Sequence, residues 1–179
     1  MNSGSVWIVT SKLSNKKMPA SVIAALLLLP MLVLLIADRV IAPHYRLALN
    51  ESESLPGTVY LVKTGDLPRC GAAIGEHVQF QMLSDARWYT GERMLKVAKG
   101  CPGDLVRIEG RKVYINNWFA GEAVPTLEDG TAMTVISAGV IPAGHFYMWA
   151  SHPSSFDSRY AEFSLISEQQ IIGAARKIF

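Results

Sequence analysis

Two short segments carry residue types that could together cleave a peptide bond. Residues 50–56 (NESESLP) place Ser54 soon after a long apolar run, and residues 94–104 (MLKVAKGCPGD) place Lys96 among apolar neighbours. A serine hydroxyl becomes an effective nucleophile only when a base removes its proton. A lysine amine can be that base only when it is neutral, and burial lowers its pKa by disfavouring the charged form. Together, the two segments predict a Ser54/Lys96 dyad that cuts peptide bonds at the outer face of a membrane.

Each segment alone has an ordinary structural alternative. A polar linker between a membrane helix and a domain would also fit residues 50–56. On an alternating strand Lys96 shares a face with Met94 and Ala98, while Lys99 points elsewhere. A solvent-facing strand lysine is the alternative for Lys96.

A third polar segment, residues 151–160 (SHPSSFDSRY), follows an apolar run. Asp157 and Arg159 are expected to pair and brace this loop. Ser155 is expected to hydrogen-bond the amine of Lys96 and orient it. The alternative is a polar surface turn.

His152 raises a second catalytic possibility, a Ser-His-Asp triad with Ser54 and Asp157. Such triads are defined by geometry, so chain order alone leaves this hypothesis open, although a histidine before proline at a turn is more often incidental. The four histidines show no metal-ligand spacing. No glycine-rich phosphate loop follows a strand. We therefore expect neither a metal nor an organic cofactor.

An uncharged apolar run over residues 20–37 is about as long as a helix needs to cross a hydrocarbon core. We predict a short basic cytoplasmic segment at residues 1–19, a transmembrane helix at 20–39 and an exported, periplasmic domain at 40–179. Three lysines before the helix favour this orientation in a bacterial inner membrane. A cleaved signal peptide is the alternative, but its apolar region would be shorter.

The residues after the apolar run alternate with the period of β-strands. Gly110 and Arg111 stand between two alternating runs, which is a good hairpin signal. A single helical turn is expected at residues 167–170. Strands are expected at residues 58–62, 76–81, 104–109, 112–116, 118–120, 145–150 and 171–179.

Composition excludes some classes of protein. The chain has 179 residues, of which 50% are hydrophobic, and its net charge of +2 is too small and scattered to indicate nucleic-acid binding. Cys70 and Cys101 are too few for a disulfide-built scaffold. They could form one disulfide in an oxidising compartment or remain two unrelated thiols.

Taken jointly, the polar segments resemble the signal peptidase I family of membrane serine proteases. The matching features are residues 52–56, Lys96 six residues before Pro102, residues 155–160 and residues 172–175. The resemblance covers roughly residues 50–179. The resemblance is greatest for the branch that serves conjugative plasmid transfer. The pattern of residues 50–56 is that of this branch, and little sequence lies between the lysine segment and residues 155–160.

The resemblance implies a mainly β, antiparallel catalytic domain after a transmembrane helix. It implies Ser54 as nucleophile, Lys96 as general base, and the Ser52 hydroxyl and Ser54 N–H as donors to the oxyanion. It also implies supporting roles for Ser155, Asp157 and Arg159. The family domain dips an apolar surface into the membrane lipid, for which Trp118, Phe119 and Trp149 are candidates.

The resemblance implies that the substrate is an exported precursor protein. In the branch that the chain resembles, this precursor is a conjugative pilin. There, an aspartate at the position of Asp157 is also linked to cyclisation of the processed pilin. One alternative is the housekeeping signal peptidase I that removes secretory signal peptides. A second is a non-catalytic, membrane-tethered β module for pilus assembly. A soluble self-cleaving Ser/Lys repressor fits less well, because the chain carries a membrane span and lacks a DNA-binding helical region.

Overall fold

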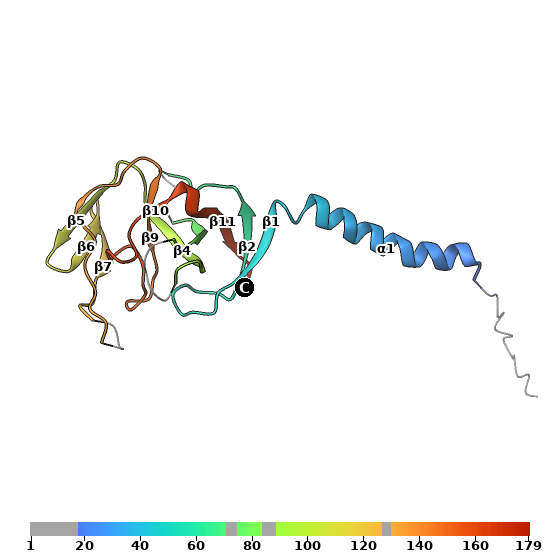
Figure 1. Cartoon of the computed structure of the whole chain (residues 1–179), viewed down its shortest axis with the longest axis horizontal. Helices are drawn as coiled ribbons and strands as arrows, with labels where there is room; N and C mark the ends of the chain where they lie inside the picture. The colour runs from blue at the N-terminus through green and yellow to red at the C-terminus, as the bar shows by residue number, and fades with distance from the viewer. Residues whose placement is uncertain (1–17, 71–74, 84–88, 127–129) are drawn as a thin grey trace, which may run out of the picture. The chain divides into compact units, whose positions relative to one another are not determined.

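The computed structural model describes residues 18–70, 75–83, 89–126 and 130–179 and divides the chain into two compact units, 1–39 and 40–179. Helix α1 (Ala20–Val40) is the first described element of the chain (Figure 1). It has 21 residues, carries no charge before Asp38, and has no buried residue. At 1.5 Å per residue it is about 31 Å long, the thickness of a bilayer core. It is therefore a candidate membrane span by length and composition.

The second unit is built from antiparallel strands, which confirms the predicted fold class (Figure 1). A seven-stranded sheet has the order β1-β2-β11-β3-β4-β9-β10, and a four-stranded sheet has the order β7-β6-β5-β8. The strands are β1 (Tyr45–Leu49), β2 (Val59–Thr64), β3 (His77–Gln81), β4 (Arg93–Gly100), β5 (Leu105–Glu109), β6 (Lys112–Ile115), β7 (Trp118–Glu122), β8 (Gly139–Val140), β9 (His145–Trp149), β10 (Ile166–Ser167) and β11 (Ile171–Lys177).

The predicted strands all occur, with ends shifted by a few residues. β5 and β6 form the predicted hairpin, with Gly110 in the left-handed region (φ 63°) at the turn. The predicted helical turn is the 3-10 helix η1 (Glu168–Gln170). Strands β1, β8 and β10 were not predicted. β8 and β10 have only two residues each, and β1 is defined by its pairing with β2 more than by its own alternation.

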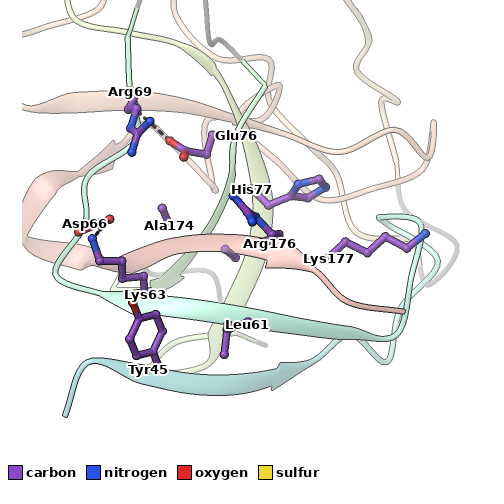
Figure 2. A pocket seen from close by; sticks show the side chains of 11 residues that line it. Tyr45, Leu61, Lys63, Asp66, Arg69, Glu76, His77, Ala174, Arg176 and Lys177 are labelled. Atoms are coloured by element: carbon purple, nitrogen blue, oxygen red, sulfur yellow. Dashed lines mark hydrogen bonds and ion pairs between the residues drawn. The ribbon is translucent and has the colours of Figure 1, made fainter. Parts of the chain in front are cut away.

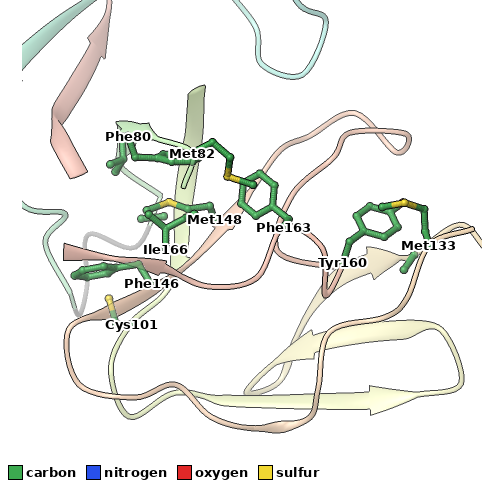
Figure 3. Close-up of a cluster of buried hydrophobic side chains, with 12 residues drawn as sticks. Phe80, Met82, Cys101, Met133, Phe146, Met148, Tyr160, Phe163 and Ile166 are labelled. Atoms are coloured by element: carbon green, nitrogen blue, oxygen red, sulfur yellow. The ribbon is translucent and has the colours of Figure 1, made fainter. Parts of the chain in front are cut away.

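The main hydrophobic core packs against one face of the large sheet (Figure 3). Strand β3 contributes Val78 and Phe80, and β9 contributes Phe146 and Met148. Cys101 also lies in this core and forms a disulfide with Cys70, with Cα atoms 5.8 Å apart. The disulfide ties the end of β4 to the segment that follows β2.

Candidate active site

Lys96 lies on strand β4 of the large sheet. It is directly opposite Val78 of β3, so its side chain starts on the same face as the main core. The residue is only 3% exposed. Burial lowers the pKa of Lys96 to about 8, while the nearby Asp157 carboxylate raises it and Arg159 lowers it. The amine can therefore lose its proton near neutral pH.

Ser54 and Lys96 line the same pocket, which we call the candidate active-site pocket. Its volume is about 470 Å³. Residues after β1 form one wall, and the first half of β4 forms another. The stacked rings of Tyr89 and Phe156, with centroids 5.6 Å apart, stand at its border. The lining residues are Leu49, Asn50, Glu51, Ser52, Ser54, Gln79, Tyr89, Glu92, Arg93, Met94, Leu95, Lys96 and Phe156.

Several contacts fix the segment that carries Ser54. The Asn50 amide donates hydrogen bonds to the carbonyl oxygens of Leu55 and Gly57, both at 2.9 Å. Leu55 is buried in a small apolar cluster with Val97 and Ala150. This packing holds an irregular polar segment against β4.

The Ser52 hydroxyl already has a partner. Its Oγ donates to the Asn50 side-chain oxygen at 3.1 Å. A hydroxyl has a single proton to donate. Ser52 would therefore have to turn away from Asn50 to reach an oxyanion.

Ser155 is buried, but no hydrogen bond joins it to Lys96. Its Oγ has no partner among the residues that the structure describes. The expected orienting contact is thus not formed in this conformation, and Ser155 keeps a free hydroxyl close to the core.

Asp157 and Arg159 form the ion pair that the sequence predicted. Both are almost fully buried, and the guanidinium bonds both carboxylate oxygens at 2.8 and 3.0 Å. Arg159 also donates to the carbonyl oxygens of His152, Pro153 and Ser155. The pair therefore holds the whole loop that follows β9.

His152 does not join a triad in the described structure. Its Nε2 lies 3.9 Å from Glu53 Oε2, and 44% of its side chain is exposed. The Asp157 carboxylate is taken by Arg159 and by the Ala150 N–H. These contacts disfavour the Ser54–His152–Asp157 alternative.

The first half of β4 has one open edge. On the β3 side, pairing covers Arg93 to Val97. On the β9 side, pairing starts only at Val97. The described strands therefore leave the backbone of residues 93–96 unpaired beside the Ser54 segment, where an extended peptide could add as a strand.

A second pocket, of about 640 Å³, lies across β2 and β11 (Figure 2). It is lined mostly by charged residues, including the pair Lys63–Asp66 at 2.9 Å, and it contains no serine or cysteine. Within the described residues, no group of three or more His, Cys, Asp or Glu side chains is placed to hold a metal ion. The described lining of this second pocket therefore offers no serine or cysteine nucleophile, whereas the candidate active-site pocket contains Ser52 and Ser54.

The exposed apolar side chains are distributed differently from the expectation. Trp149 is half-buried and donates its indole N–H to the carbonyl oxygen of Ala120 at 2.7 Å. Trp118 and Phe119 are exposed, and so are Leu47 and Leu49 on β1, the edge strand. β1 thus adds a surface stripe that sequence reasoning missed.

Comparisons with known proteins agree on one family. The family model for signal peptidase, peptidase S26, matches residues 19–179. A conjugal transfer protein TraF of Agrobacterium fabrum is 31% identical over 87 residues, 48% of each chain. A conjugal transfer protein TraF of Agrobacterium tumefaciens is 32% identical over 92 residues, also 48% of each chain. The matched region spans about half the length of these curated relatives.

A solved structure was also matched. The crystal structure of a signal peptidase I from Enterococcus faecalis aligns with 59% of this chain and 97% of its own, at 20% identity and a TM-score of 0.36.

Proposed function

Because the chain belongs to the signal peptidase family, peptidase S26, we propose that it is a membrane-anchored serine endopeptidase with a Ser54/Lys96 dyad. The observation that carries the proposal is the shared pocket of a serine and a buried lysine whose pKa is lowered to about 8. With this pKa, about a tenth of the enzyme has the neutral amine at pH 7. That fraction suffices for general-base catalysis, because the optimum base has a pKa near the working pH.

In the acylation step, Ser54 Oγ attacks the scissile carbonyl carbon while Lys96 Nζ takes the hydroxyl proton. The resulting ammonium then gives this proton to the leaving amine as the C–N bond breaks. In deacylation, Lys96 takes a proton from water, and the hydroxide oxygen attacks the ester. Ser54 then leaves with the proton that Lys96 returns.

The developing oxyanion needs donors. The Ser54 backbone N–H donates no hydrogen bond within the described residues, so it is free for this role. The Ser52 hydroxyl is the second donor once it turns from Asn50. One such donor is typically worth a few kcal/mol of transition-state stabilisation.

The substrate that we propose is an exported precursor, specifically a conjugative pilin. The two TraF relatives are named for conjugal transfer. Helix α1 anchors the enzyme in the inner membrane by a single pass, with the N-terminus in the cytoplasm and the catalytic domain in the periplasm. The open edge of β4 receives the precursor as an extended strand.

Co-expression with a candidate pilin precursor tests the proposal. Ser54→Ala and Lys96→Ala should abolish processing, as read by gel mobility and by the mass of the product. Lys99→Ala is the matched control, because Lys99 is three residues away on the same strand but packs over the Trp118 ring. Unchanged processing by either dyad variant would refute the proposal.

The mass of the mature pilin separates two outcomes of the same chemistry. Hydrolysis gives an open chain, whereas attack by the substrate's own amine on the acyl-enzyme gives a ring that is lighter by one water. Cleavage of secretory preproteins instead of the pilin would favour the housekeeping activity. Absence of any cleavage by purified protein would favour the non-catalytic module.

A further inference from the structure

Gln79 is a buried polar residue that has no role in the proposed Ser54/Lys96 mechanism. It lies in the middle of β3, is only 7% exposed, and lines the candidate active-site pocket. Its side-chain oxygen is fully buried and has no hydrogen-bond partner among the described residues. A buried amide oxygen without a partner costs free energy that an apolar residue of similar size would not.

The neighbours of Gln79 make its polarity more unusual. Val78 and Phe80 on either side are fully buried and apolar. Gln79 lies directly opposite Leu95 of β4, so the two side chains share the sheet face opposite to that of Lys96. Gln79 is thus the polar floor of a partly apolar subsite beside Leu95.

This subsite lies where a bound peptide would present its side chains. An extended peptide on the open edge of residues 93–96 points alternate side chains to the two faces of the sheet. Side chains on one face would meet Lys96. Those on the other face would lie next to Leu95, with Gln79 one strand further along the same face and in the same pocket lining. The carboxamide could then donate to or accept from a substrate group at that position.

We infer that Gln79 is a specificity-determining residue that selects, in the subsite beside Leu95, a small substrate side chain carrying a hydroxyl or carboxamide over an aliphatic one of the same size. This inference rests on the proposed peptidase function. A substrate that supplies the hydrogen bond satisfies the buried amide, whereas an isosteric aliphatic side chain leaves it unpaired. One such hydrogen bond corresponds to about a tenfold preference in kcat/KM.

A position-randomised peptide library, cleaved by the full-length protein in detergent and sequenced by mass spectrometry, tests this inference. At one position near the cleaved bond, threonine should be preferred about tenfold over its isostere valine. Gln79→Met should remove or reverse that preference and leave the preferences at other positions unchanged. Gln81→Met is the matched control, because Gln81 is on the same strand and exposed.

The outcomes are distinguishable. No threonine preference in the wild-type protein, or an unchanged preference in Gln79→Met, overturns the inference while leaving the peptidase proposal intact. No cleavage at all by the wild-type protein contradicts the peptidase proposal itself. If Gln79→Met fails to fold, the wild-type threonine-to-valine ratio remains decisive.

Discussion

Ser151 donates two hydrogen bonds to the carbonyl oxygen of Ser54, one from its backbone N–H and one from its hydroxyl, both at 3.2 Å. These bonds join segments 97 residues apart in the chain. Because Asp157 and Arg159 hold the loop that contains Ser151, the ion pair also positions the proposed nucleophile. We therefore expect the buried pair to affect the position of Ser54 although it lies away from that residue in the chain.

Asp157→Asn should destabilise the domain strongly. The substitution leaves the buried Arg159 guanidinium without a counter-charge. Loss of one partner of a buried ion pair typically lowers the free energy of unfolding by about 3 to 5 kcal/mol. Thermal unfolding of the full-length protein in detergent measures the effect. Asp66→Asn is the control, because its Lys63 pair is exposed and its loss should change little. Equal effects of the two substitutions would contradict the importance of burial.

Lys96→Met should stabilise the protein while abolishing activity. A fall in the pKa of Lys96 from 10.5 to about 8 corresponds to about 3 kcal/mol of penalty for the buried ammonium at pH 7. Because the folded-state pKa is the lower one, wild-type stability should rise as the pH increases from about 8 towards 10.5. The advantage of the variant should therefore shrink over this window.

Unfolding curves of Lys96→Met at pH 7 and pH 10 measure this difference. Lys99→Met is the comparison, since Lys99 lies 5.1 Å from the Trp118 ring centroid and its removal should destabilise slightly. A Lys96→Met variant less stable than wild type at pH 7 would show that the charged amine is well accommodated.

His152→Ala should keep precursor processing within a few-fold of wild type. The imidazole is exposed and lies beside Glu53, while Asp157 is occupied by Arg159. Initial rates on a precursor peptide measure this effect. A loss as large as that of Ser54→Ala would instead support a Ser-His-Asp triad.

The Cys70–Cys101 disulfide should contribute to stability. It closes a loop with a sequence separation of 31, which corresponds to about 3 to 4 kcal/mol in the chain-entropy description. A double Cys70→Ser, Cys101→Ser variant should unfold at lower temperature than wild type, and reduction of wild-type protein should give the same shift. Reduction that also lowers the melting temperature of the double variant would show that the effect is unrelated to this bond.

Much of the fold could be predicted from local pattern. Alternation placed β3, the β5–β6 hairpin and β11, because side-chain periodicity is a property of the segment itself. Strand alternation also correctly predicted that Lys96 shares a sheet face with Met94 and Ala98. The edge strand β1 was missed, because it is identified by its pairing with β2.

The finer contacts of the site could not be predicted. Whether Ser52 turns towards Asn50 or the pocket depends on a side-chain rotation. Gln79 is buried and unpartnered because of the strands packed around β3. Alternation along β3 alone does not show whether the face that carries the glutamine is covered. Tertiary packing decides both features.

Acyl-enzyme trapping tests the central claim most directly. The full-length protein would be mixed with a peptide ester, quenched in acid and mapped by mass spectrometry. We predict an acyl group on Ser54 whose rate of formation rises with pH through an apparent pKa of about 8, with no adduct in Ser54→Ala or Lys96→Ala. An adduct on another residue, or an unchanged rate in Lys96→Ala, would contradict the Ser54/Lys96 dyad.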